Sequence, residues 1–292
     1  MIDKFYSKVY LPCSKQHVCV RQLVNFEFIQ LQKFLLDDHD DLIAEYFEHI
    51  IAATCREKID TESLSNIDKL VYLIKLRSIS CGDLINFVNR RNIQASIQMG
   101  TVLDKIYEID YQSASSLMTV SSSMSIEFGL PTSLYTVMDN ELVFHLVKKI
   151  ILRDNTIDLS TIPYKDKRSI IQELNSSVVH QSYNFIKHSS NLSTLVFQGN
   201  KDLDLSDIVV SPYNASLIEF LKFIFQDDLM IQYKTLYILS SKVHLDPAYL
   251  DTVAPIEQQI FTKFFSDEVE EHNKQLKSSQ KSLHTSPHGQ SI

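Results

Sequence analysis

Histidine and cysteine are the residue types of this chain that could support catalysis or metal binding. The 10 histidines include no His-Glu-x-x-His pattern and no other familiar ligand spacing. His180 and His188 lie about two turns apart on a predicted helix, and no further ligands accompany them. Cys55 ends an apolar helix face, which favours a buried thiol over a nucleophile paired with a histidine. We therefore expect no catalytic residue and no metal site.

Acidic and small residues offer no stronger candidate site. The acidic run at 37–41 lacks the glycine and the distal glutamate of a calcium-binding EF-hand loop, so it is expected to begin a helix. The serine-rich stretch 113–125 has no Gly-x-Ser-x-Gly nucleophile elbow. The chain has 5 glycines, whereas average usage would give roughly 20. Because phosphate-cradling loops need glycine, we expect no cofactor and no enzymatic activity. An enzyme with an unrecognised site would need a deep pocket containing His180, His188 or Cys55.

Composition limits the partners and the compartment. The 292 residues are typical of two domains, and the net charge of −8 argues against a nucleic-acid or anionic membrane partner. Four cysteines are few for a disulfide framework. Cys13 and Cys19 could face each other across a hairpin, but small apolar thiols in a reducing cytoplasm are favoured. No apolar run approaches the ~20 residues of a membrane span, and none follows Met1 as a signal peptide would.

Residues 1–82 are predicted to form an N-terminal unit of one hairpin and three helices. Apolar and polar residues alternate over 7–22 around a polar turn, and three segments with 3,4-spaced apolar residues follow. Gly82 lies just past the third helix, where a left-handed C-cap residue is usual. Asp68 and Arg77 lie on different turns of that helix, and Arg77 suits the negative end of its dipole. A structural salt bridge or cap is favoured for them over a ligand site.

Three further parts are predicted. Residues 83–131 are expected to form a β-rich middle element with a serine and threonine face, the alternative being a flexible linker. Residues 132–277 are predicted to be a helical domain, including one helix that runs from Asp139 through Ile151. Within that domain, 192–211 is ambiguous and contains two candidate short strands. The polar tail, 278–292, is expected to be disordered. The predicted fold class is mainly α with a smaller β component (α+β).

The last predicted helix carries the candidate partner-binding residues Phe261, Phe264 and Phe265. A stripe of this kind is most often part of a core. It could instead be a docking face, because the helix becomes fully charged after Val269 and is expected to project from its domain.

Several short motifs have a recognisable order and spacing. They are Leu11-Pro12-Cys13-Ser14-Lys15, Val20-Arg21-Gln22-Leu23, Asp68-Lys69-Leu70, Leu76-Arg77-Ser78-Ile79-Ser80-Cys81-Gly82, Ile126-Glu127-Phe128-Gly129-Leu130-Pro131-Thr132 and Ala254-Pro255-Ile256-Glu257. In this order they resemble the baseplate hub assembly proteins of T-even-type contractile-tailed phages. The match is close over 8–82 and thin elsewhere, and Cys13 and Cys19 depart from the family pattern.

The resemblance implies a non-enzymatic protein that works through protein–protein contacts in tail assembly. It implies either a chaperone that leaves or a hub component that stays in the virion baseplate, made in the host bacterial cytoplasm. Expected partners are other baseplate hub proteins and the tape-measure protein, and self-association is left open. No nucleic acid, membrane or cofactor is implied. The alternative hypothesis is a helical adaptor or regulatory protein that binds a partner helix.

Overall fold

The computed structural model describes residues 6–36, 39–88, 94–109, 111, 117–134, 141–160, 162–192, 195–197, 208–211 and 216–284. The chain divides into two compact units. Unit 1 comprises Met1–Gln22 and Gln30–Gln226, and unit 2 comprises Leu23–Ile29 and Asp227–Ile292. The described residues are mainly helical and also form several small antiparallel sheets, which confirms the predicted α+β class.

Unit 1 begins with a hairpin of β1 (Tyr6–Leu11) and β2 (Gln16–Arg21). The register places Cys19 opposite Lys8, and Cys13 lies in the turn. Cys13 and Cys19 therefore do not face each other across the strands. Strand-forming valines at 9, 18 and 20 point to the buried face, as alternation predicts.

Three helices follow the hairpin, as predicted: α1 (Asn25–Leu35), α2 (Asp40–Thr54) and α3 (Asn66–Cys81). Asp40 and Asp41 occupy the first turn of α2, where their charge suits the helix dipole. α3 is buried on nearly every side, which is typical of a helix at the centre of a fold. It packs against β1, β2, α2, α4 and α9 of unit 1.

The segment after α3 contains a helix that was not predicted. β3 (Leu84–Val88) and β4 (Gln94–Gln98) form a hairpin, and α4 (Met99–Tyr107) follows directly. Met99, Val102 and Ile106 are buried on one face of α4. Their 3,4 spacing indicates a helix, which the prediction of a β-rich segment here did not include.

A four-stranded antiparallel sheet forms the next part of unit 1, in the order β5-β6-β7-β8. The strands are β5 (Leu117–Ser121), β6 (Met124–Phe128), β7 (Val147–Leu152) and β8 (Asn155–Asp158). The boundary expected at residue 131 thus falls between β6 and β7, which are hydrogen-bonded neighbours.

The helix predicted through Ile151 was wrong beyond residue 146. α6 (Leu142–Leu146) ends there, and the chain continues as β7. Val147, Ile150 and Ile151 are β-branched and suit a strand, and β6 offers them a partner edge. Asp139, the expected cap, lies outside the described residues.

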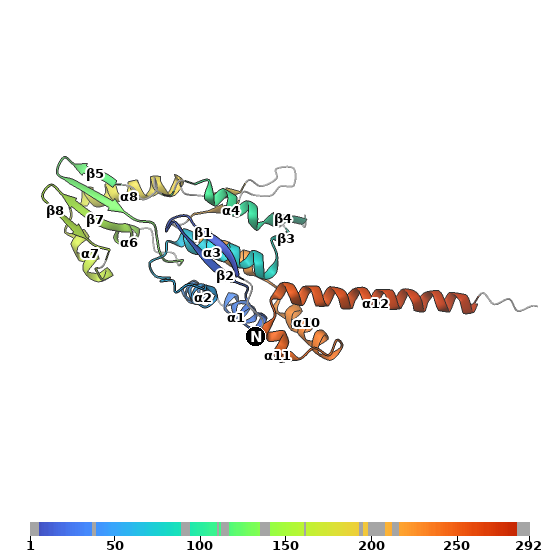
Figure 1. Cartoon of the computed structure of the whole chain (residues 1–292). Coiled ribbons are helices and arrows are strands. Elements are labelled where there is room, and N and C mark those ends of the chain that lie inside the picture. The colour runs from blue at the N-terminus through green and yellow to red at the C-terminus, as the bar shows by residue number, and fades with distance from the viewer. Residues whose placement is uncertain are drawn as a thin grey trace, which may run out of the picture. The chain divides into compact units, whose positions relative to one another are not determined.

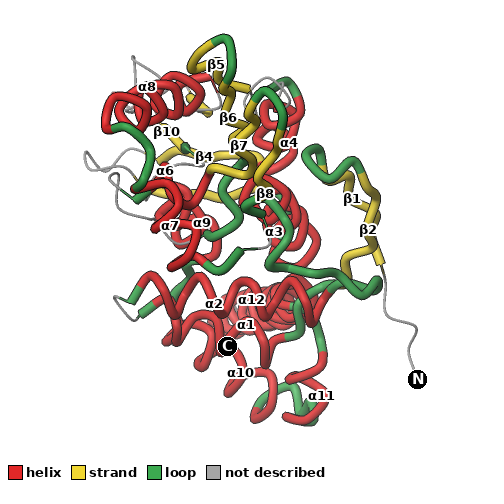
Figure 2. The backbone as a smooth tube through the Cα atoms, turned by 90° about the vertical axis from the view of Figure 1, so that its left-hand side faces the viewer, coloured by secondary structure: helices red, strands yellow, loops and turns green. Residues whose placement is uncertain are grey.

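Helices and two short strands complete unit 1. α7 (Tyr164–Gln172) and α8 (Ser176–Leu192) share a hydrophobic core with α6 and the four-stranded sheet (Figure 2). The ambiguous stretch forms β9 (Leu195–Phe197) and β10 (Ile208–Val210), which pair antiparallel. α9 (Ser216–Phe225) follows and packs on α3.

Unit 2 contains α10 (Leu229–Ser241), α11 (Pro247–Thr252) and α12 (Pro255–His284), together with the start of α1. Asn25 joins these parts, because its backbone N–H donates to the Val253 carbonyl and its Nδ2 donates to the Leu250 carbonyl, each at 2.8 Å.

α12 begins at Pro255, as predicted, and extends well past α10 and α11 (Figure 1). It continues to His284 and so includes the first part of the tail that was expected to be disordered. Lysine and glutamine have high helix propensity, which lets a polar segment prolong the helix. Residues 285–292 lie outside the described residues.

Candidate functional site

The family-like motifs meet where the hairpin turn contacts the start of α3, which we call the hairpin–α3 junction. Asp68 is fully buried, and its two carboxylate oxygens accept hydrogen bonds from the backbone N–H groups of Cys13 and Ser14, both at 2.9 Å. Ser65 caps α3 by accepting a hydrogen bond from the Asp68 N–H at 3.1 Å. One carboxylate thus satisfies a turn whose amides would otherwise lack partners.

Lys69, the next residue of α3, also belongs to this junction. Its side chain is 1% exposed, and Nζ donates to Glu48 of α2 and to the Thr132 carbonyl. The Asn66 N–H donates to the Pro131 carbonyl at 2.8 Å. The motif that ends in Pro131 and Thr132 is therefore tied to the motif that begins at Asp68, although the two lie far apart in sequence.

Arg77 and Gly82 finish α3. The Arg77 guanidinium donates to the Gly82 carbonyl at 2.9 Å and to the Ile224 carbonyl of α9 at 2.7 Å. Gly82 has φ 97°, a conformation that favours glycine, and its N–H donates to the Ser78 carbonyl. This confirms the prediction that these residues form a cap, and that Asp68 and Arg77 do not pair.

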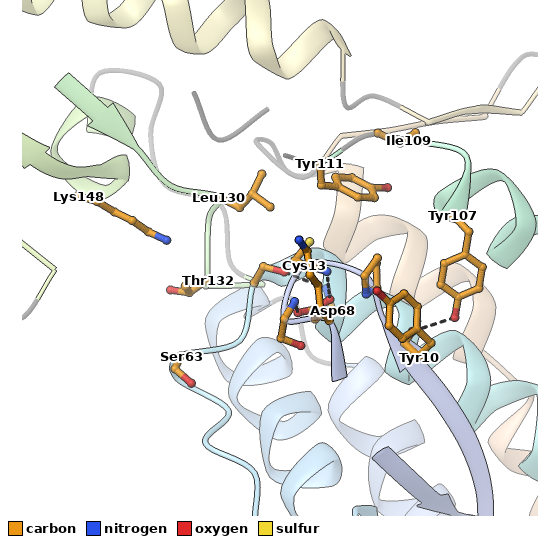
Figure 3. Close-up of a pocket in the computed structure, with 14 residues that line it drawn as sticks. Tyr10, Cys13, Ser63, Asp68, Tyr107, Ile109, Tyr111, Leu130, Thr132 and Lys148 are labelled. Carbon is orange, nitrogen blue, oxygen red and sulfur yellow. Dashed lines mark hydrogen bonds between the residues drawn. The ribbon is translucent and has the colours of Figure 1, made fainter. Parts of the chain in front are cut away.

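A cavity of about 610 Å³ opens beside the hairpin–α3 junction (Figure 3). Its lining comes from the hairpin, the start of α3, the end of α4 with the residues after it, the segment after β6, and β7, all in unit 1. The lining residues are Tyr10, Pro12, Cys13, Ser14, Lys15, Ser63, Ser65, Asp68, Tyr107, Ile109, Tyr111, Leu130, Thr132 and Lys148. The Tyr107 hydroxyl donates to the Tyr10 carbonyl at 2.9 Å, which links the end of α4 to the hairpin.

The cavity is suited to binding and not to nucleophilic attack. Burial raises the pKa of the Cys13 thiol to about 12, and the nearby Asp68 carboxylate adds to the rise, although a hydrogen bond with Ser65 opposes it. A thiol with that pKa stays protonated at neutral pH and is a poor nucleophile. Burial also raises the pKa of Tyr111. The cavity therefore offers neutral hydroxyl and thiol groups beside the charged side chains of Lys15, Asp68 and Lys148.

The other residues considered for catalysis are not brought together. His180 and His188 are both exposed on α8, and only His180 lines a shallow cavity of about 580 Å³. Burial raises the pKa of Cys55 to about 11, and its thiol donates to Glu57 at 3.6 Å. Within the part of the chain that the structure describes, no group of three or more His, Cys, Asp or Glu side chains could hold a metal ion.

The predicted partner-binding phenylalanines lie near the start of α12. Phe264 is 65% exposed, whereas Phe261 and Phe265 are half-buried. Every residue from 266 to 278 is exposed. The stripe is thus not a closed core: it presents one aromatic ring to solvent just before the helix becomes fully exposed.

No single sequence motif indicates the cavity beside the hairpin–α3 junction. Its lining comes from segments that are distant in sequence, and Tyr107, Tyr111 and Lys148 belong to no motif. The one signal in the sequence was that the motifs around Pro12, Asp68 and Leu130 each carry residues that line it.

A family model described as T4 bacteriophage base plate protein matches residues 5–202, which is more than half of the chain. No curated protein and no solved structure matches the chain. None of the helices that the structure describes has the length and the apolar character needed to cross a bilayer. The chain therefore belongs to the T4 bacteriophage base plate protein family.

Proposed function

We propose that this chain is a non-enzymatic protein of the phage baseplate hub that acts through contacts with other proteins. Membership of the T4 base plate family over residues 5–202 is the observation that carries the proposal. The contacts made by residues of the family-like motifs support it. Asp68, Lys69 and Arg77 each bind backbone or side-chain groups of the same chain, so their roles are structural.

The proposed partners are other baseplate hub proteins and the tape-measure protein, with assembly beginning in the host cytoplasm. Unit 2 supplies a candidate contact surface, which we call the unit 2 aromatic surface. It consists of exposed apolar side chains on α10, α11 and α12: Met230, Ile231, Tyr233, Tyr237, Tyr249, Ile260 and Phe264. Exposed apolar side chains mark an interaction site where they form one contiguous patch.

The test is a pull-down of the tagged full chain from infected cells, followed by mass spectrometry of the recovered proteins. We expect baseplate hub or tape-measure proteins, and recovery of no tail protein would contradict the proposal. Purified mature tails then separate the two roles: the chain is present if it is a hub component, and absent if it is a chaperone that leaves.

A second candidate function is a helical adaptor that binds a partner helix. The exposed length of α12 favours it, because a long helix outside a core can pair with another helix. Recovery of one host or viral regulatory protein without any tail protein would support the adaptor over the hub protein.

A further inference from the structure

The second half of α12 is a helix that lies in solvent on all sides. Every residue from 266 to 278 is exposed, and Figure 1 shows α12 extending well past α10 and α11 of its own unit. Most helical stability in proteins comes from the packing of an amphipathic face and less from helix propensity. An exposed helical segment that carries an apolar face is therefore expected to meet a partner.

Val269 and Leu276 form the apolar face of this segment. They lie seven residues apart, which is within about 20° of two complete turns, so both side chains lie on the same side of the helix. Val269 is 42% exposed and Leu276 is 49% exposed. Because apolar residues at seven-residue intervals are how helices pair in coiled coils, this face is suited to another helix.

The charges of the same segment are separated along its length. The acidic residues come first and the lysines follow: Asp267, Glu268, Glu270 and Glu271, then Lys274 and Lys277. Glu270 pairs with Lys274 of its own helix at 3.8 Å, but both side chains are more than half exposed, so this pair contributes little. An acidic part followed by a basic part is complementary to a second copy of itself that runs in the opposite direction.

One twofold axis satisfies the apolar and the charged residues together. An axis between residues 272 and 273 places Val269 level with Leu276 of the second copy. Glu270 follows Val269 and Lys277 follows Leu276, so both charges lie on the same flank of the apolar face. The axis brings this flank of one copy beside the same flank of the other, where Glu270 and Lys277 of the second copy differ in level by about 3 Å.

Parallel pairing in register does not satisfy the same residues. It places the acidic residues 267–271 of one copy beside the same residues of the second copy. Like charges that face each other across an interface are destabilising. The charge pattern therefore favours the antiparallel arrangement.

We propose that α12 joins two copies of this chain in an antiparallel, twofold-symmetric dimer. Val269 and Leu276 form its apolar contact, and Glu270 of each copy pairs with Lys277 of the other. The same surface is used on both copies, so the assembly closes at two chains. The dimer goes beyond the proposed function and does not depend on it, because it needs no other tail protein.

The direct test is sedimentation equilibrium of the purified full chain over a range of concentrations. We expect the mass to rise from 33.7 kDa to twice that value, with a dissociation constant in the micromolar range because the contact is short. A mass of 33.7 kDa at every concentration up to millimolar would overturn the proposal and leave this face to a helix of another protein.

Charge reversal tests the orientation of the two helices. Glu270→Lys or Lys277→Glu places like charges beside each other twice in the dimer, so each should weaken dimerisation by roughly tenfold. The first variant raises the net charge of the chain and the second lowers it, so a loss in both cannot come from net charge. The double variant keeps the wild-type net charge and reverses each ion pair, so its dissociation constant should return to within about threefold of the wild-type value. A double variant as weak as the single ones would contradict antiparallel pairing.

Two further variants separate the proposed face from the rest of α12. Glu271→Lys is the matched control for Glu270→Lys, because it makes the same charge change about 160° around the helix from Val269, and it should alter dimerisation by less than about twofold. Leu276→Gln removes an apolar contact and keeps a good helix former, so dimerisation should weaken by roughly tenfold while urea unfolding of the dilute monomer stays unchanged. Wild-type dimerisation by Leu276→Gln, or equal losses from Glu270→Lys and Glu271→Lys, would show that this face does not join the two copies.

Discussion

The hairpin–α3 junction and the exposed part of α12 use charged residues in opposite ways. At the junction, Asp68 and Lys69 are almost completely buried, and each binds groups that are distant in sequence. On α12, Glu270 and Lys274 pair at 3.8 Å while both are more than half exposed. A buried charge that loses its partner is costly, whereas an exposed ion pair contributes little. The first region therefore fixes the fold, and the second is free to meet a partner.

The family match includes the first of these two regions but not the second. It covers residues 5–202 and so includes the junction, whereas α10, α11 and α12 lie beyond it. The unit 2 aromatic surface thus lies outside the matched part, and the cavity beside the hairpin–α3 junction lies inside it. Variants in the two regions should separate stability from partner binding.

The largest effect is expected from Asp68→Ala. It leaves the Cys13 and Ser14 amides of the hairpin turn without their acceptor, which should lower the free energy of unfolding by roughly 3 kcal/mol. Urea unfolding of the full chain measures this change. Asp267→Ala on the exposed part of α12 is the matched control and should be nearly neutral. Equal losses from both variants would contradict the comparison.

Gly82→Val should have the next largest effect. A β-branched residue at φ 97° is strained, and we expect a loss of roughly 2 kcal/mol in thermal unfolding. Gly100→Val is the matched control, because a Cβ atom there meets Asp83 only at an ordinary distance of 3.6 Å. If the Gly82 variant unfolds at the wild-type temperature but loses partner binding, the structural role assigned to Gly82 is wrong.

Arg77→Ala should lower stability by about 1 kcal/mol or somewhat more, because two backbone carbonyls lose a charged donor at helix ends. Arg77→Lys keeps the charge but cannot reach both carbonyls with one planar group. Its stability should therefore lie between that of the wild type and that of Arg77→Ala. Chemical denaturation ranks the three proteins. If Arg77→Ala melts at the wild-type temperature but no longer captures its partner, Arg77 is a binding residue and not a structural one.

The pH dependence of stability offers a smaller test at the junction. The pKa of Cys13 is about 12 in the folded protein against an ordinary value of 9.0. Its contribution is therefore fully present below pH 9 and is lost as the pH rises toward 12. We expect the unfolding free energy of Cys13→Ala to fall less steeply above pH 9 than that of the wild type. Parallel pH profiles would show that burial does not perturb this thiol.

Phe264→Ala should have the smallest effect on stability. The ring is 65% exposed, so the change should stay within about 0.5 kcal/mol. Capture of tail proteins should nevertheless decrease if the unit 2 aromatic surface is a contact site. Lys263→Ala on the neighbouring exposed position is the control. A large loss of stability would place Phe264 in a core, and unchanged capture would remove it from the contact site.

Local patterns predicted some elements well and others poorly, for physical reasons. The hairpin, α2 and α3 have strong periodicity and end signals such as Gly82, so their positions followed from the sequence. The run from Leu142 to Ile151 fits a helical period, yet pairing with β6 makes its second half a strand. α4 was missed although Met99, Val102 and Ile106 have helical spacing.

The candidate site could not be predicted in the same way. Phe264 was found because an aromatic stripe is visible along one helix. The cavity depends on Tyr111 and Lys148 meeting the hairpin turn, which only the tertiary fold brings about. No local window contains that information, since the lining residues run from Tyr10 to Lys148.

The bond between the hairpin turn and Asp68 has a consequence for hydrogen exchange. Turn amides at the tip of a hairpin usually exchange quickly, but those of Cys13 and Ser14 bond to a carboxylate that is 55 and 54 residues away. Closing a loop of that length costs roughly 3–4 kcal/mol of chain entropy. These two amides should therefore become protected late in refolding, and in the native protein they should exchange only when α3 and the hairpin separate.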